Sequence, residues 1–190
     1  MTANEVLGGL AVVTGLCFYA TYFYGIWRGQ IRPHAYTWLV FSILNGIGFA
    51  ALHLEGGGPG AWTLGVTSFA SFVTFVIGLL MREKDITRSD TVALVFALLA
   101  IPVWVVTDNA LWAVIIISCI DVAALYPTFR KSWHKPHEEG ALSFTLSGVE
   151  YSFALAALQS YSVITVLYPA TIVVVDGLLV LMLLYRRRQV

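Results

Sequence analysis

The feature that most constrains this chain is a succession of long apolar segments, which leaves little sequence for anything else. Candidate segments cover residues 6–26, 35–54, 60–81, 91–106, 111–126, 142–158 and 163–185. A helix that crosses a membrane needs about 20 apolar residues. Only 12% of the residues are charged, against about 25% in a typical soluble domain. The sequence therefore predicts an all-α integral membrane protein with seven transmembrane helices.

The fourth and fifth segments decide the number of spans. Residues 91–126 are too long for one span, and the sequence TDNA at 107–110 interrupts them; Asp and Asn favour turns. With seven spans, all eleven Lys and Arg residues lie on one side of the membrane, whereas a single span here would move six of them to the other side. Because basic loops stay in the cytoplasm, we expect a multi-pass protein of the cell membrane with its N-terminus outside and its C-terminus in the cytoplasm.

An internal repeat is the second constraint. At an offset of 106 residues, Trp27 aligns with Trp133 and the Ala-Ala-Leu of 50–52 aligns with that of 156–158. Each unit has three helices, so two units joined directly would have opposite orientations in the membrane. One extra helix between them gives both units the same orientation. The result is a parallel repeat, related by an axis along the membrane normal. We expect a 3+1+3 arrangement: repeat 1 at 1–82, a linker with helix 4 at 83–110, and repeat 2 at 111–190. Such a repeat places a site between the halves; the alternative is a duplication that left no site.

Three short motifs carry a resemblance to a known family. They are YPTFRKSWHKP at 126–136, SILNG at 42–46 and YPAT at 168–171. With the 3+1+3 layout, they make the chain resemble the PQ-loop and SWEET-type transporter superfamily. The resemblance implies a seven-helix bundle that moves a small solute by alternating access, with Pro127 as the motif proline. Ala170 replaces the asparagine that binds substrate in the family, so the resemblance implies the fold more than the substrate.

Pro127 is also the candidate hinge of a cytoplasmic gate. Proline removes a backbone donor and loosens a helix, and freed backbone groups in a bilayer must face protein or water. The alternative is a plain helix end followed by a basic loop.

Three carboxylates, all in repeat 2, lie within the predicted spans: Asp121, Glu150 and Asp176. A charged group at the centre of a membrane costs at least about 2.5–3.5 kcal/mol, so it normally faces a cavity or a partner. We interpret them as candidate proton-coupling groups. The alternative is a neutral carboxyl group that is hydrogen-bonded to a neighbour.

Uncharged polar residues mark the candidate translocation path. Thr67 and Ser71 belong to a stripe at helical spacing in 60–81, although small hydroxyl residues also serve helix packing. Asn45 and Tyr151 occupy the same repeat position and are the favoured pair of substrate contacts. Trp62 and Tyr168 are also matched, near the predicted outer mouth, where an aromatic belt explains them equally well.

Several kinds of function find no support in the sequence. The formal net charge of +0 excludes the basic footprint of a nucleic-acid-binding protein. His134 and His137, with the two neighbouring glutamates, fall in a polar loop without further ligands, so we expect no metal. No nucleophile–base–acid set and no phosphate-binding loop is present, so we expect neither an enzyme nor a cofactor.

The function predicted is therefore a transporter of a small polar solute in a lipid bilayer, with or without proton coupling. A sugar, an amino acid, a vitamin and a small amine all remain open as the solute. The alternatives are a ligand-binding membrane receptor on the same fold, as in KDEL-receptor-like proteins, and a structural membrane subunit. The sequence leaves open whether the protein is a monomer or a homo-oligomer.

Overall fold

The described part of the chain is entirely helical. The computed structural model describes residues 1–29, 33, 35–81, 88–134, 136–138 and 141–189. These form the α-helices α1 (Ala3–Trp27), α2 (Ala35–Leu54), α3 (Trp62–Leu80), α4 (Arg88–Thr107), α5 (Ala110–His134), α6 (Ala141–Ala156) and α7 (Val163–Arg187), with the short 3-10 helices η1 (Gly58–Ala61) and η2 (Pro136–Glu138). The prediction of an all-helical chain is confirmed.

Four helical segments are long and apolar enough to cross a membrane. They are α1, α2, the continuous segment Gly58–Leu80 that joins η1 to α3, and α7. The chain is therefore a helical membrane protein. The apolar stretches of α4 and α5, Leu94–Thr107 and Ala110–Leu125, are shorter, and α6 has only 16 residues.

Local sequence explains where the helices begin and break. Thr2 and Glu5 form a capping box at the start of α1, and Ser162 and Thr165 do the same for α7; such caps satisfy the free N–H groups of a first turn. The break between α4 and α5 falls at the predicted turn, where Asp108 has a φ of 49°, a conformation that Asp tolerates better than most residues.

Helix α5 is longer than the sequence indicated. It continues through Pro127 to His134, whereas the apolar segment ends at 126. Proline weakens a helix without always ending it, because neighbouring helices can satisfy the freed backbone groups in a membrane protein. Residues 128–134, which include the cluster of basic residues, therefore extend α5 and do not form a loop.

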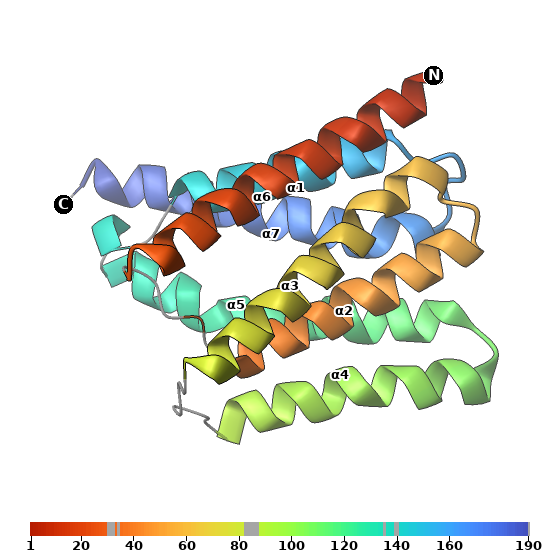
Figure 1. The fold of residues 1–190 in the computed structure, drawn as a ribbon, viewed down its shortest axis with the longest axis horizontal. Coiled ribbons are helices and arrows are strands. Elements are labelled where there is room, and N and C mark those ends of the chain that lie inside the picture. Colours follow the sequence, from red (N-terminus) through yellow and green to blue (C-terminus); the bar gives the residue numbers. More distant parts are fainter. Residues whose placement is uncertain (30–32, 34, 82–87, 135, 139–140, 190) are drawn as a thin grey trace.

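The helices run up and down side by side. α1, α3, α5 and α7 all end at the same end of the bundle, on the left of Figure 1, where the C-terminus lies; the N-terminus lies at the other end. We call the first end the basic end, because the described residues there include Arg28, Arg88, Arg186, Arg187 and Arg188. α3 packs between α1 and α2, and α7 packs between α5 and α6. α1 packs on α6 and α2 packs on α5, while α4 lies outside, against α2 and α5.

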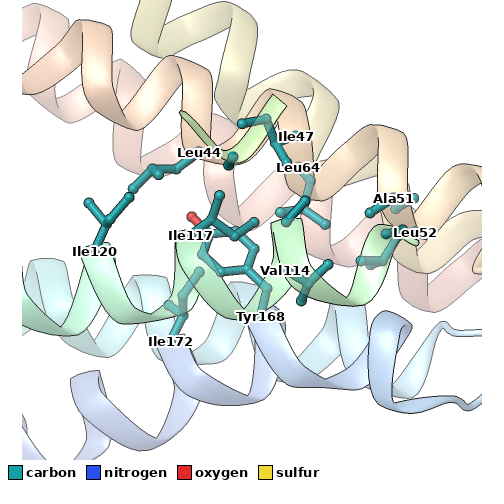
Figure 2. Close-up of a cluster of buried hydrophobic side chains, with 14 of the residues drawn as sticks. Leu44, Ile47, Ala51, Leu52, Leu64, Val114, Ile117, Ile120, Tyr168 and Ile172 are labelled. Carbon is teal, nitrogen blue, oxygen red and sulfur yellow. The ribbon is translucent and has the colours of Figure 1, made fainter. Parts of the chain in front are cut away.

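The main apolar core lies where α2, α3, α5 and α7 meet (Figure 2). It includes Leu44, Ile47, Leu64, Val114, Ile117, Tyr168 and Ile172. The large ring of Tyr168 fits because α2 has Gly48 opposite it: a Cβ built on Gly48 would lie 2.8 Å from Cδ1 of the ring. Small residues allow such close approach between membrane helices.

The end opposite the basic end is closed by contacts between the two halves. The side-chain amide of Asn4 donates to the carbonyls of Ala157 (3.2 Å) and Leu158 (2.8 Å). The backbone N–H of Gln159 donates to the carbonyl of Gly57 at 3.2 Å. The Leu158 side chain is 2% exposed. The loops after α2 and α6 thus seal this end of the bundle.

Candidate functional site

A cavity of about 290 Å³ lies inside the bundle, among six of its helices. Its described lining comes from α1 (Phe18, Tyr19), α2 (Trp38, Phe41, Asn45), α3 (Thr67, Ser71), α5 (Asp121, Leu125), α6 (Ser143, Phe144, Ser147, Glu150, Tyr151) and α7 (Tyr168, Ile172, Asp176). Helices α1–α3 and α5–α7 both contribute, so the cavity lies between the two halves of the chain.

The cavity is reached from the basic end. Ser143, in the first turn of α6 at that end, is exposed, whereas Glu150 and Tyr151, about two turns deeper, are buried. Beyond the middle of the bundle, the contacts around Leu158 close the way. The described lining therefore reaches the surface at the basic end, and the described contacts close the bundle at the other end.

The Glu150 carboxyl group is held by two hydroxyls of α3. Its Oε1 accepts hydrogen bonds from Thr63 Oγ1 at 2.6 Å and Thr67 Oγ1 at 3.0 Å. On the side of α1, Gly15 leaves room for the carboxyl group: a Cβ built there would lie 2.7 Å from Oε1. Thr63, Thr67, Ser71 and Thr74 are all buried, so the predicted stripe does face the inside of the bundle.

Asn45 and Tyr151 bind each other. The Tyr151 hydroxyl donates to Asn45 Oδ1 at 2.6 Å, and Asn45 Nδ2 donates to the Phe41 carbonyl at 2.9 Å. Both residues line the cavity. The two predicted substrate contacts therefore lie together, but part of their hydrogen-bonding capacity is already used.

Asp121 and Asp176 lie on α5 and α7, and each is buried, at 7% and 4% exposure. Both line the cavity, and Ser147 of α6 lies beside the Asp176 carboxyl group. No Lys, Arg or His occurs among the described lining residues. The structure thus brings the three predicted carboxylates to one cavity, whose described lining contains no cationic side chain.

Tyr19 is a lining residue that the sequence did not single out. Its hydroxyl is hydrogen-bonded to Ser71 Oγ at 2.7 Å and donates to the Thr67 carbonyl at 3.3 Å. Trp38 and Phe144 were also missed as lining residues. They do align at the offset of 106 residues, so the repeat contained a signal for them, whereas Tyr19 aligns with Leu125 and carried none.

Tyr168 and Trp62 occupy different environments. Tyr168 is fully buried and lines the cavity, and its hydroxyl has no hydrogen-bond partner among the described residues. It thus lies deeper than the predicted outer mouth. Trp62 is 44% exposed at the start of α3 and does not line the cavity. Its surface position fits the alternative of an interfacial aromatic belt.

Two further predictions fall partly outside the described residues. Pro127 belongs to α5, but its side chain is not described, so its role as a hinge stays a prediction. Among the residues searched, no group of three or more His, Cys, Asp and Glu side chains is placed to hold a metal ion. Glu139, one of the four residues considered for a metal, lies outside the described residues.

Comparison of the chain with protein-family models, with curated proteins and with solved structures gave no match. The resemblance to the PQ-loop and SWEET-type superfamily therefore rests on the sequence motifs and stays a prediction.

Proposed function

We propose that the chain is a membrane transporter that moves a small polar solute by alternating access. The observation that carries this proposal is the cavity. It lies between the two halves, is lined by three carboxyl groups, reaches the surface at the basic end and is closed at the other. Carboxyl groups buried inside a membrane bundle are costly, and they normally face a partner, water or a solute. The structure then represents the state that is open toward the basic end.

The proposal includes seven spans. The other three helices, α4, α5 and α6, have shorter apolar stretches, but they lie alongside the four that qualify and run between the same two ends of the bundle (Figure 1). A bilayer that covers the long helices therefore covers the others as well. The exposed face of α4 is apolar, as contact with lipid requires; it includes Val95, Phe96, Leu98, Leu99 and Val105.

The orientation follows from the basic end, which we place in the cytoplasm. To test it, Cys17 and Cys119, which are both exposed, are first replaced by alanine. A single cysteine is then placed at exposed Glu55 or at exposed His134. In intact cells, an impermeant thiol reagent is expected to label the first and not the second. Labelling of position 134 from outside would overturn both the orientation and the count of seven spans.

The parallel repeat is supported by the scheme of helix contacts. A two-fold axis would exchange α1 with α5, α2 with α6 and α3 with α7. Under this exchange the contact of α1 with α6 becomes that of α5 with α2, and the contact of α2 with α7 becomes that of α6 with α3. All four contacts are present. Asn45 and Tyr151, which are 106 residues apart, touch each other. Residues related by a two-fold axis can touch only at that axis, so the cavity that both line would lie on it. We propose the 3+1+3 arrangement and the resemblance to PQ-loop proteins on this ground.

Proton coupling is a further part of the proposal. Glu150 and Asp176 line the same cavity, where two charged carboxylates repel each other. Coupled transport requires that protonation differ between two conformations. The residues that a proton would occupy are therefore present in the path of the solute.

Transport is tested in proteoliposomes loaded with radiolabelled glucose, alanine or choline. The protein is expected to release at least one of these faster than protein-free liposomes do. Ser147→Trp, which fills the cavity, is expected to stop that release. Ser152→Trp is the matched control, because Ser152 lies on the same helix, is exposed and does not line the cavity.

The alternatives predict other outcomes in this assay. A receptor would bind a solute in a manner that Ser147→Trp abolishes and would release none of the three. A structural subunit would neither bind nor release a solute. Either result would contradict transport.

A further inference from the structure

The cavity has an unbalanced charge. Asp121, Glu150 and Asp176 line it at 7%, 3% and 4% exposure, and none of the described lining residues is a Lys, Arg or His. Ionisable groups inside a membrane pair with one another or serve as counter-ions for a ligand. Because three acids cannot neutralise one another, a proton or a ligand has to supply the positive charge.

Several hydrogen-bond donors in and around the cavity are already used, although the Tyr168 hydroxyl is not. Thr63 and Thr67 donate to Glu150, Tyr151 donates to Asn45, and Asn45 donates to a backbone carbonyl. A sugar or an anion would need several free donors, because a buried polar group left unpaired costs free energy. What the cavity offers instead are acceptors: the carboxyl oxygens. Both hydrogen bonds to Glu150 converge on Oε1, so the other oxygen of this carboxyl group has no described hydrogen bond.

Aromatic rings form much of the remaining wall. They belong to Phe18, Tyr19, Trp38, Phe41, Phe144, Tyr151 and Tyr168. The face of an aromatic ring attracts a cation, and quaternary ammonium ligands are commonly bound between such rings. Among the described residues, Tyr168 is fully buried and its hydroxyl is left without a partner. Carboxylates surrounded by rings match an ammonium group better than any neutral solute.

The volume limits the size of the ligand. A cavity of about 290 Å³ lies at the small end of the range of about 300–1,000 Å³ that is usual for small-molecule sites. A small organic amine therefore suits it better than a large ligand.

We propose that the cavity binds a small organic cation, with Asp176 and Glu150 as its counter-ions and the surrounding rings as its walls. The inference rests on the proposed function, since it names the solute class of the same site. The cation and a proton compete for the same carboxyl groups, so movement of the solute is exchange against protons. No bond to the solute forms or breaks; a proton leaves a carboxyl group as the cation arrives.

The other titratable groups that face these two carboxyl groups are few in the described part of the chain. They are Tyr19 from α1, Asp121 from α5, Tyr151 from α6 and Tyr168 from α7, while α2 and α3 contribute no titratable lining residue. The tyrosines remain neutral over the range in which carboxyl groups titrate in proteins. Competition between cation and proton therefore reports on the three acids.

The test is calorimetric binding to the purified full-length protein in detergent. Choline and tetraethylammonium are the cationic probes, and 3,3-dimethylbutan-1-ol, which has the shape of choline without its charge, is the matched neutral probe. Choline is expected to bind at least about tenfold more tightly than the alcohol, the difference of about 1.4 kcal/mol that one good cation site supplies. Binding is expected to weaken as the pH falls. Titrations in buffers of different ionisation enthalpy are expected to show proton release.

Three variants sharpen the test. Asp176→Asn and Glu150→Gln are expected to weaken choline binding by at least about tenfold, and Asp108→Asn is expected to leave it unchanged. Asp108 is an exposed acid in the turn between α4 and α5, so this control makes the same chemical change away from the cavity. The comparison of choline with the alcohol uses only the parent protein and does not depend on whether a variant folds.

Several results would overturn the inference. They are equal binding of choline and the alcohol, parent-like choline binding in both cavity variants, and no binding of either cation at millimolar concentration. Binding of choline without flux in proteoliposomes would support the inference and contradict transport. Flux of glucose or alanine without binding of any cation would support transport and contradict the inference of a cation site. A failure of the cation site and a failure of the proposed transport can therefore be distinguished.

Discussion

Helices α1–α3 and α5–α7 contribute different chemistry to the same cavity. The second group carries the three acids, Asp121, Glu150 and Asp176. At the matching positions, 106 residues earlier, the first group has Gly15, Leu44 and Ala70. These helices supply hydroxyls and space instead: Thr63 and Thr67 bind Glu150, and Gly15 lies against it. For Glu150, one half therefore carries the acid, and the other half supplies its hydrogen-bond partners and the space that it fills.

The difference shows how two similar halves can share one task. If both halves carried the acids, twice as many carboxyl groups would face one another in a dry cavity, which like-charge repulsion disfavours. Dividing the roles keeps the number of charges small and gives Glu150 its hydroxyl partners. It also makes the two halves non-interchangeable, and the following variants test that.

The largest effect is expected from removing an acid. Asp176→Asn is expected to abolish accumulation of solute driven by an imposed pH gradient in proteoliposomes, because the amide cannot take up and release the proton. Glu150→Gln is expected to do the same if the two acids share the proton. Exchange at saturating solute is expected to persist in each variant, since one of the two acids remains. Parent-like accumulation in both variants would show that proton coupling does not pass through these residues.

A smaller effect is expected from filling the space that the first half leaves. Gly15→Ala places a Cβ 2.7 Å from Glu150 Oε1 and 2.9 Å from its Cδ. Glu150 is held by two threonines and cannot easily move, so we expect a loss of about 1–3 kcal/mol in the free energy of unfolding, typical of overpacking. Thermal or denaturant unfolding in detergent measures it.

Gly9→Ala is the control for this change. Gly9 lies on the same helix, and a Cβ built there meets nothing within 4 Å among the described atoms. We expect this variant to be as stable as the parent or slightly more stable. In a background of Glu150→Ala, Gly15→Ala should no longer cost stability. Equal stability of the Gly15 and Gly9 variants in the parent background would contradict the packing described here.

The smallest effect is expected at the contact between the halves. Tyr151→Phe removes the 2.6 Å hydrogen bond to Asn45. We expect a loss of about 0.6 kcal/mol in stability and at most about 1.7 kcal/mol, the average and the maximum measured for such bonds in a membrane protein. Tyr185→Phe, at an exposed tyrosine of α7, should change nothing. If Tyr151→Phe costs no more than Tyr185→Phe, the pair does not hold the halves together.

Much of the fold could be predicted because hydropathy and turn chemistry are local properties. The apolar segment at 35–54 coincides with α2, and the TDNA sequence lies at the break between α4 and α5. The stripe that contains Thr67 and Ser71 was visible because helical spacing alone brings hydroxyls to one face. The three acids were visible because charge inside an apolar segment is rare.

Other features depend on contacts that no local pattern contains. The depth of Tyr168 is set by Gly48 on another helix, so its position near the start of the last helix was misleading. Tyr19 lines the cavity because Ser71 and Thr67 of α3 bind its hydroxyl. Where α5 ends could not be read from Pro127, because a proline ends some helices and only bends others.

The most direct test of alternating access is a single cysteine inside the cavity. Ser147→Cys, in a chain with Cys17 and Cys119 replaced by alanine, places a small thiol in the cavity wall beside Asp176. An impermeant thiol reagent is added either outside or inside sealed vesicles of known orientation. We expect the thiol to react from both sides, faster from the basic end, and to be protected by a solute that the protein transports. Reaction from the basic end alone, in the presence and absence of solute, would contradict alternating access and would identify the cavity as a one-sided binding site.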